Sequence, residues 1–131
     1  MNTPITAKTV FVVEDSALLR ARLVEMIGEI PDVHIVGEAS SPIAAIAGIM
    51  RTLPHFVVLD YQLDGGTGVE VLHSIRGQWP DIKFIVLTNY SQPQVRRVCI
   101  EAGAHAFFDK STEMDKVRVF IANFSYEISG Q

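Results

Sequence analysis

The sequence lacks features that several classes of protein require. Its single cysteine, Cys99, excludes an internal disulfide and makes a reducing compartment the expected location. It has no run of lysines and arginines, and its 11 basic residues are outnumbered by 15 acidic ones. The net charge of -4 argues against a nucleic-acid groove binder and weakly against binding to an anionic membrane surface.

Long apolar segments are also missing. No stretch approaches the roughly 18 apolar residues that a membrane span requires. The first residues lack the basic segment and apolar run of a signal peptide. Repeats, linkers and low-complexity tracts are absent from the 131 residues. These observations predict a soluble cytoplasmic protein with a single domain, 1–131, that makes no contact with membrane or nucleic acid.

Five short apolar runs, rich in β-branched residues, divide the chain. Continuous runs of this length are typical of strands buried on both faces of a parallel sheet. After each run, apolar residues recur with the period of a helix. Right-handed crossovers place such helices on both faces of one sheet, so the pattern predicts an α/β, doubly wound (βα)5 fold. The runs lie at 10–13, 35–36, 56–59, 84–87 and 106–108.

Residues typical of helix ends separate these segments. Ser41 before Pro42 predicts a capped helix start, and Gly103 stands where a helix end requires a left-handed residue. Three hydroxyl residues are followed, three positions later, by an acid or amide, which predicts a capping box at each. These pairs are Thr67 with Glu70, Ser91 with Gln94, and Thr112 with Asp115.

Polar side chains follow four of the five predicted strands at the carboxyl edge, where ligands of such sheets bind. They are Glu14, Asp15, Asp60, Thr88 and Lys110. Three adjacent carboxylates repel one another, and Mg²⁺, which prefers oxygen ligands, relieves that repulsion. Aspartate is a known phosphoryl-accepting nucleophile, while an ammonium and a hydroxyl suit phosphate oxygens. The set therefore predicts phosphoryl chemistry at this edge.

Four segments in this order resemble a response-regulator receiver domain of two-component signal transduction. The likeness extends roughly from Lys8 to Tyr126. It implies a flavodoxin-like sheet with strand order 2-1-3-4-5 and a core of about 8–126. The segments that carry it are 11–16, 57–61, 86–88 and 102–110.

The resemblance also implies a role for each residue of the site. Asp60 corresponds to the phosphoacceptor. Asp15 corresponds to a direct ligand of Mg²⁺ (or Mn²⁺), Glu14 to the acid that holds the metal through water, and Gln62 to the residue that offers a backbone carbonyl. The implied catalytic partners and switch residues are Thr88 for the switch hydroxyl, Lys110 for the phosphate contact and Phe107 for the switch aromatic.

The implied function is a phosphorylation-dependent switch rather than an enzyme that turns over external substrates. A histidine kinase or histidine phosphotransfer protein would phosphorylate Asp60, and the domain would catalyse only this transfer and its own dephosphorylation. The surface of the fourth helix, fifth strand and fifth helix would then change to control a partner protein or output domain, with homodimerisation through it as a hypothesis. A stand-alone protein and a fragment of a longer regulator both remain open.

Three positions depart from the family pattern. Asp64 stands where a proline is frequent, Asn89 where a small residue follows the switch threonine, and Ser111 where a proline follows the lysine. These changes affect the expected rates and the coupling of the switch rather than the identity of the site. Gln62 and Tyr90 occupy positions that tune dephosphorylation in the family.

Two alternative functions share this topology. An aspartyl-phosphate hydrolase typically has a second acid two residues after its nucleophile, and Gln62 stands there instead. A flavodoxin-like cofactor binder needs a hydroxyl- and glycine-rich loop after the first strand, where the sequence has Glu14 and Asp15. The histidines lack the spacing of zinc ligands, and Cys99 falls on the apolar side of its helix, so we expect no zinc site and a core cysteine.

Overall fold

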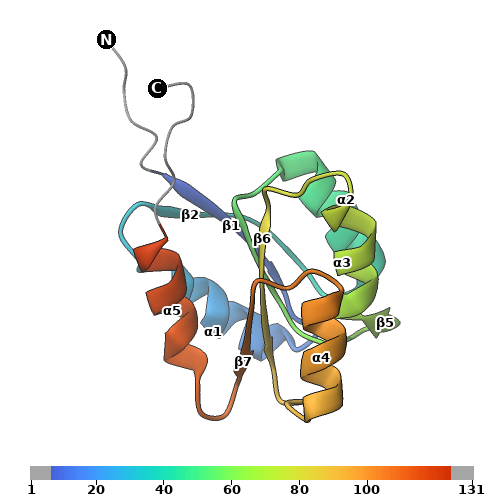
Figure 1. Cartoon of the computed structure of the whole chain (residues 1–131). Coiled ribbons are helices and arrows are strands. Elements are labelled where there is room, and N and C mark those ends of the chain that lie inside the picture. Colours follow the sequence, from blue (N-terminus) through green and yellow to red (C-terminus); the bar gives the residue numbers. More distant parts are fainter. Residues whose placement is uncertain (1–6, 125–131) are drawn as a thin grey trace.

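A five-stranded parallel sheet forms the centre of the computed structural model, which describes residues 7–124 (Figure 1). Its order, β2-β1-β3-β6-β7, is the order 2-1-3-4-5 of the main strands, so the predicted fold is confirmed. All four strand pairs are parallel. The strands are β1 (Lys8–Val13), β2 (Val33–Ala39), β3 (Phe56–Leu59), β6 (Lys83–Thr88) and β7 (Ala106–Asp109).

Helices cover both faces of the sheet. Figure 1 shows α1 and α5 on one face, and α2, α3 and α4 on the other. Alternate residues of a strand face opposite sides, so Val10 and Val12 belong to one core while Phe11 and Val13 belong to the second. No helix within 7–124 is long and apolar enough to cross a bilayer. The helices are α1 (Ala17–Gly28), α2 (Pro42–Thr52), α3 (Gly68–Arg76), α4 (Pro93–Glu101) and α5 (Met114–Asn123).

Several predicted helix ends are confirmed. The Ser41 hydroxyl accepts a hydrogen bond from the backbone N–H of Ala44 at 3.2 Å, with Pro42 in the first turn of α2. At the start of α3, the Glu70 carboxylate accepts from the Thr67 backbone N–H at 2.9 Å. Gly103, just past α4, has φ +117°, a conformation that side chains disfavour.

Two of the predicted capping boxes are wrong. The helix α4 begins at Pro93 without a side-chain cap, because the Ser91 hydroxyl donates to Asp109 at 2.6 Å instead of capping the helix. The helix α5 begins at Met114, and the residue before it, Glu113, accepts from the backbone N–H of Asp109 at 2.9 Å. At α4 the end of β7 thus competes with the helix for the Ser91 hydroxyl. At α5 the N-cap residue is Glu113 rather than Thr112, so the predicted spacing is one residue out of position.

A small hairpin between β3 and α3 was not predicted. Its strands are β4 (Gln62–Leu63) and β5 (Gly66–Thr67), with Gly65 at φ +81° in the turn. The backbone N–H of Asp64 donates to the carbonyl of Ser40 at 3.1 Å. This bond fixes the hairpin beside the start of α2.

The two ends of the described chain lie together. The Lys8 ammonium, at the start of β1, donates to the carbonyls of Ile121 at 2.7 Å and Ala122 at 3.2 Å. These carbonyls belong to the last turn of α5, which lacks intrahelical partners for them. The first strand and the last helix are therefore joined at the edge of the sheet opposite the predicted site (Figure 1).

Candidate phosphorylation site

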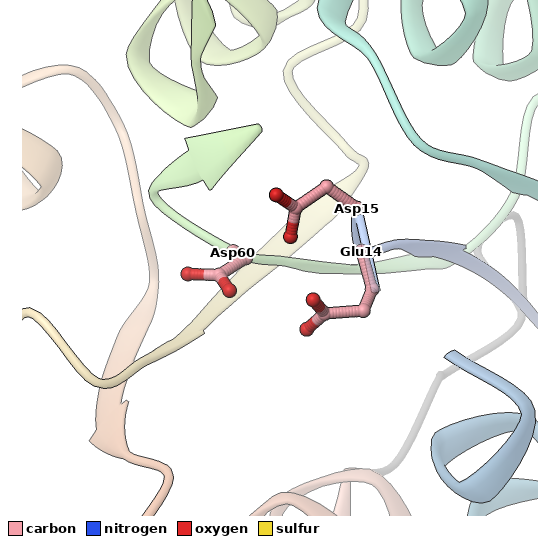
Figure 2. Close-up of side chains that lie close together, drawn as sticks. All are labelled: Glu14, Asp15 and Asp60. Carbon is pink, nitrogen blue, oxygen red and sulfur yellow. The ribbon is translucent and has the colours of Figure 1, made fainter. Parts of the chain in front are cut away.

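Three carboxylates gather at the carboxyl edge of the sheet (Figure 2). Glu14 and Asp15 follow β1, and Asp60 follows the neighbouring strand β3. One carboxylate oxygen from each lies within 4.8 Å of the others. Glu14 is 1% and Asp60 6% exposed, whereas Asp15 is open to solvent. Two acids are thus withdrawn from water while the third keeps the site accessible.

Lys110, at the end of β7, supplies the opposing charge. Its ammonium lies 2.5 Å from Oε1 of Glu14 and 2.6 Å from Oδ2 of Asp60. Burial raises the pKa of the Glu14 carboxyl, and its hydrogen bonds with Lys110 and Ser16 offset this only in part. Burial by itself would lower the pKa of the Lys110 ammonium, but its bonds to Asp60 and Glu14 outweigh burial and raise it. The ammonium therefore remains charged between the two acids.

Backbone N–H groups orient the other carboxylate oxygens. Oδ1 of Asp60 accepts from the N–H of Tyr61 at 2.6 Å, and Oε2 of Glu14 accepts from that of Ser16 at 3.1 Å. Gly68 packs so closely that a Cβ there would collide with the carbonyl oxygen of Asp60. Both oxygens of each carboxylate are therefore hydrogen-bonded, which fixes the orientation of Glu14 and Asp60 toward a ligand.

Thr88 ends β6 beside this cluster and is fully buried. Its hydroxyl oxygen accepts from the backbone N–H of Tyr90 at 3.1 Å. Its carbonyl accepts from the N–H of Lys110 at 3.0 Å, so the backbones that bear the hydroxyl and the ammonium are directly connected. The loops after β6 and β7 are therefore joined by a backbone hydrogen bond beside the site.

Phe107, in β7, lies opposite Val86 of β6 and is 5% exposed. The guanidinium of Arg96, on α4, lies 5.5 Å from the centre of its ring, within the range of a cation–π contact. Arg96 also donates a long hydrogen bond of 3.5 Å to the Phe107 carbonyl. The aromatic side chain is thus packed inward and covered from α4.

Comparison with known proteins agrees with this geometry. The family described as the response regulator receiver domain matches residues 10–122. The chain belongs to this family. Receiver domains are the switch modules of two-component response regulators, so the recognition made from the sequence is confirmed.

Two curated relatives are longer proteins that this chain matches in part. It is 34% identical over 101 residues to the DNA-binding transcriptional activator DevR/DosR of Mycobacterium tuberculosis, covering 77% of the chain and 46% of the relative. It is 35% identical over 106 residues to protein-glutamate methylesterase/protein-glutamine glutaminase 1 of Pseudomonas savastanoi, covering 79% of the chain and 29% of the relative. The chain thus spans about half or less of the length of these relatives.

Solved structures of receiver domains have the same fold. The receiver domain of the response regulator NarL from Mycobacterium tuberculosis superimposes with a TM-score of 0.80 at 26% identity, covering 91% of this chain and 98% of that one. A LuxR-family DNA-binding response regulator from Staphylococcus aureus gives 0.81 at 26% identity, covering 87% and 95%.

The receiver site fits a hard divalent cation by the chemistry of its donors. The cluster of Glu14, Asp15 and Asp60 offers only carboxylate oxygens, which Mg²⁺ prefers, and the exposed Asp15 leaves room for the waters that Mg²⁺ retains. Gln62 lies in β4, two residues from Asp60, with an exposed side chain. Its role as a carbonyl ligand stays a prediction.

Other features of this receiver site were not anticipated from the sequence. The rings of Tyr61 and Tyr90 lie 6.2 Å apart, on the loops that follow β3 and β6. The Asp109 carboxylate accepts from the hydroxyls of Ser91 and Ser111, and from the backbone N–H of Ser111. The only sequence signal for either feature was the presence of polar or aromatic residues next to the strand ends.

The three departures from the family pattern lie around the site rather than in it. Asp64 is exposed in the hairpin and Asn89 is exposed after β6. Ser111 donates to Asp109 beside Lys110, and the described residues contain no cis peptide bond. Cys99 is 1% exposed, as expected of a core residue, and burial together with the charge of Asp60 raises the pKa of its thiol to about 11.

Proposed function

We propose that this receiver domain is switched by phosphorylation of Asp60, with the phosphoryl group supplied by a histidine kinase or a histidine phosphotransfer protein. One observation carries the proposal. Asp60 is an almost fully buried carboxylate with an ammonium at 2.6 Å and two further acids within 4.8 Å. A buried acid held this way at a strand end suits a nucleophile better than a structural cap.

In the proposed reaction a carboxylate oxygen of Asp60 attacks the phosphorus of the donor phosphohistidine. The new bond is an acyl phosphate, and the phosphorus–nitrogen bond breaks with its electron pair going to the imidazole, which takes up a proton. The Lys110 ammonium exchanges part of its contact with Asp60 and Glu14 for a phosphate oxygen. Lys110 thereby compensates the charge that arrives, as a point charge does.

A divalent metal is the cofactor of this proposal. Asp15 would hold it directly and Glu14 through water, with Asp60 and the carbonyl of Gln62 completing the protein ligands. When bound, Mg²⁺ or Mn²⁺ neutralises negative charge on the phosphoryl group and the acids.

The signal would leave the site through Thr88. Its hydroxyl, which now accepts from Tyr90, would turn to donate to a phosphoryl oxygen, and the loop after β6 would follow. Phe107 would then change position together with its contact to Arg96, which lies on α4. The surface of α4, β7 and α5 would change shape. A useful switch requires phosphorylation to favour the active state by a few kcal/mol.

The changed surface would control a partner protein or an attached output domain. Two similar proteins, DevR/DosR and the LuxR-family regulator from Staphylococcus aureus, are DNA-binding regulators, which supports an output of this kind without specifying it. Gln62 replaces the acid that would activate water or a leaving group in a hydrolase. The domain would therefore catalyse its own phosphorylation and dephosphorylation only.

Intact mass spectrometry after incubation with magnesium and acetyl phosphate tests the proposal. Wild type is expected to gain one phosphoryl group, about 80 Da, while Asp60→Asn gains nothing. Asp64→Asn is the matched control, because Asp64 is an exposed acid in the same loop, and it should gain the group. A phosphoryl group on Asp60→Asn, or none on wild type together with no binding of beryllofluoride, would contradict the proposal.

A further inference from the structure

The outer face of α2 carries almost no charge. Four of its exposed residues are Ile43, Ala44, Ala47 and Met50, and Ile43 is 83% exposed. Within 7–124, each of the other four helices exposes two or more charged or histidine side chains, whereas α2 exposes only Arg51, in its last turn. A surface helix normally turns a polar face to water, so an apolar outer face indicates a surface that becomes covered.

The position of α2 leaves this face accessible. The helix packs against β2, which is an edge strand of the sheet, and against α3. Its inner face is already occupied, since Ala45, Gly48 and Ile49 are buried. Figure 1 shows α2 beside α3, at the end of its helical layer away from α4. The apolar stripe is therefore separate from the inner face that stabilises the fold.

Opposite charges stand at the two ends of the stripe. Arg51 lies at the carboxyl end of α2. Asp64 lies near the amino end, because its N–H is bonded to the carbonyl of Ser40 and the hairpin residue Gly66 approaches Pro42. Both side chains are exposed, and the ion pairs found among the described residues include neither. The ends of α2 are thus complementary to each other when one copy of the helix is reversed.

We propose that the outer face of α2 is an interface between two copies of this chain, with the two helices antiparallel about a two-fold axis beside Ala47. This axis lies midway between Ile43 and Met50, so Ile43 of one copy packs on Met50 of the other. The small side chain of Ala47 lets the helices approach closely at the centre. Arg51 of each copy then meets Asp64 of its partner, which makes the contact self-complementary, as a two-fold interface requires.

The small area of the apolar stripe on α2 limits the affinity of the proposed dimer. A contact made by one helix per copy lies at the low end of specific interfaces, so we expect a weak dimer with a Kd of roughly 0.1 mM. Ion pairs at the rim contribute less to affinity than to the choice of the antiparallel arrangement.

Sedimentation of the full chain without phosphoryl donor tests the interface independently of the phosphorylation proposal. The average mass of wild type should rise with concentration up to about 1 mM. Ala47→Glu places two like charges at the axis and should weaken association at least about tenfold. Val119→Glu, a similar change at an exposed position on α5, should leave association unchanged. Circular dichroism verifies that each variant is folded.

A charge exchange tests the antiparallel arrangement. Arg51→Asp and Asp64→Arg should each weaken the dimer, and the two together should restore it to within about threefold of wild type. A wild type that stays monomeric throughout, as expected if the stripe serves a different partner, would overturn the proposal. So would a dimer that Val119→Glu disrupts and Ala47→Glu does not, or a double exchange without restoration.

Discussion

Lys110 brings a positive charge to a place where two carboxylates are almost fully buried. The side chain is itself only 6% exposed, so the three groups neutralise one another with little help from water. Such an arrangement adds little stability compared with apolar residues, but removing one member leaves the others uncompensated. The residue that we propose contacts the phosphoryl group is therefore also a residue on which the folded state depends at this edge.

We predict that Lys110→Met lowers the free energy of unfolding by about 3 kcal/mol in metal-free buffer at neutral pH, because Glu14 and Asp60 then face each other without a cation. Urea denaturation measures this directly. Lys116→Met is the matched control, since Lys116 pairs with Glu113 on the surface and its loss should change little. Equal effects of the two substitutions would contradict the structural role of Lys110.

His55 gives the fold a dependence on pH that is separate from the site. The Nδ1 of its imidazole accepts from the backbone N–H of Thr9 at 3.0 Å, and the backbone N–H of His55 donates to the Thr9 hydroxyl at 3.1 Å. Burial lowers the pKa of the imidazole below its usual 6.5. The unfolded chain therefore takes up this proton more readily, so the stability contributed by neutral His55 is complete above pH 6.5 and declines as the pH falls below it.

His55→Asn should make the unfolding free energy less dependent on pH between about pH 5 and 7, because the Asn amide oxygen accepts the same hydrogen bond without titrating. The measurement is urea denaturation of both proteins across this range. Burial also lowers the pKa of His105. His105 is present in wild type and in the variant, so its contribution to the pH dependence of unfolding cancels when the two proteins are compared. An unchanged slope in the variant would show that His55 does not carry the effect.

At the scale of elements, the end of α4 depends on one glycine. Gly103 has φ +117°, and a Cβ there would collide with the side chain of Arg76 on α3. Gly103→Ala should therefore lower the free energy of unfolding by about 1–3 kcal/mol, as seen where a side chain is forced into a left-handed conformation.

Gly28→Ala, at the end of α1, is the matched control for Gly103→Ala. A Cβ at Gly28 meets nothing within 4 Å, and its φ is not positive. This substitution should be neutral or stabilise the protein by about 0.4–1 kcal/mol, because it restricts the unfolded chain. Urea denaturation of both variants separates conformational strain from the general effect of replacing a glycine. Similar losses in the two would refute the argument.

The main strands and helices could be predicted because the local spacing of apolar residues in each agrees with the burial that the whole fold gives it. The run Phe56–Leu59 is apolar at every position, and the strand it forms is buried on both faces. The hairpin β4–β5 could not be predicted, since strands of two residues have no measurable period. The predicted cap at Ser91 failed because its hydroxyl bonds to Asp109 at the end of another strand. The predicted cap at Thr112 failed because α5 begins one residue later, with Glu113 as its N-cap.

The site was likewise predictable in part. Glu14, Asp15 and Asp60 were expected together because carboxyl ends of parallel strands meet at one edge, and the structure places them there. The direct contact of Lys110 with two of these acids, and the position of Arg96 over Phe107, depend on side-chain conformations. Spacing along the chain carries no information about those conformations.

At the scale of the whole molecule, two exposed apolar regions lie on different sides. One is the outer face of α2. The other is marked by exposed apolar residues on the elements that flank β7, among them Val98 on α4 and Val119 on α5, which are 43% and 56% exposed. The second region belongs to the surface of α4, β7 and α5 that phosphorylation is proposed to change. The two regions can therefore support separate associations that respond to different conditions.

We predict that beryllofluoride, which mimics the phosphoryl group, strengthens self-association through α4, β7 and α5, and that Val119→Glu removes this gain. Sedimentation with and without the mimic measures it. Leu18→Glu on α1 is the control, because Leu18 is 64% exposed but lies outside this surface. Association that does not respond to the mimic in wild type would count against a phosphorylation-dependent dimer.

The hydrogen bonds from Lys8 to the end of α5 determine where another domain can be attached to this one. A polypeptide entering at β1 and one leaving after α5 pass through the same pole of the molecule, and Asp60 stands at the other pole. The six residues of β6 span about 20 Å between these poles. A module fused to either end would thus begin at the pole away from Asp60, and under the proposed switch the signal would reach it along the surface of α4, β7 and α5.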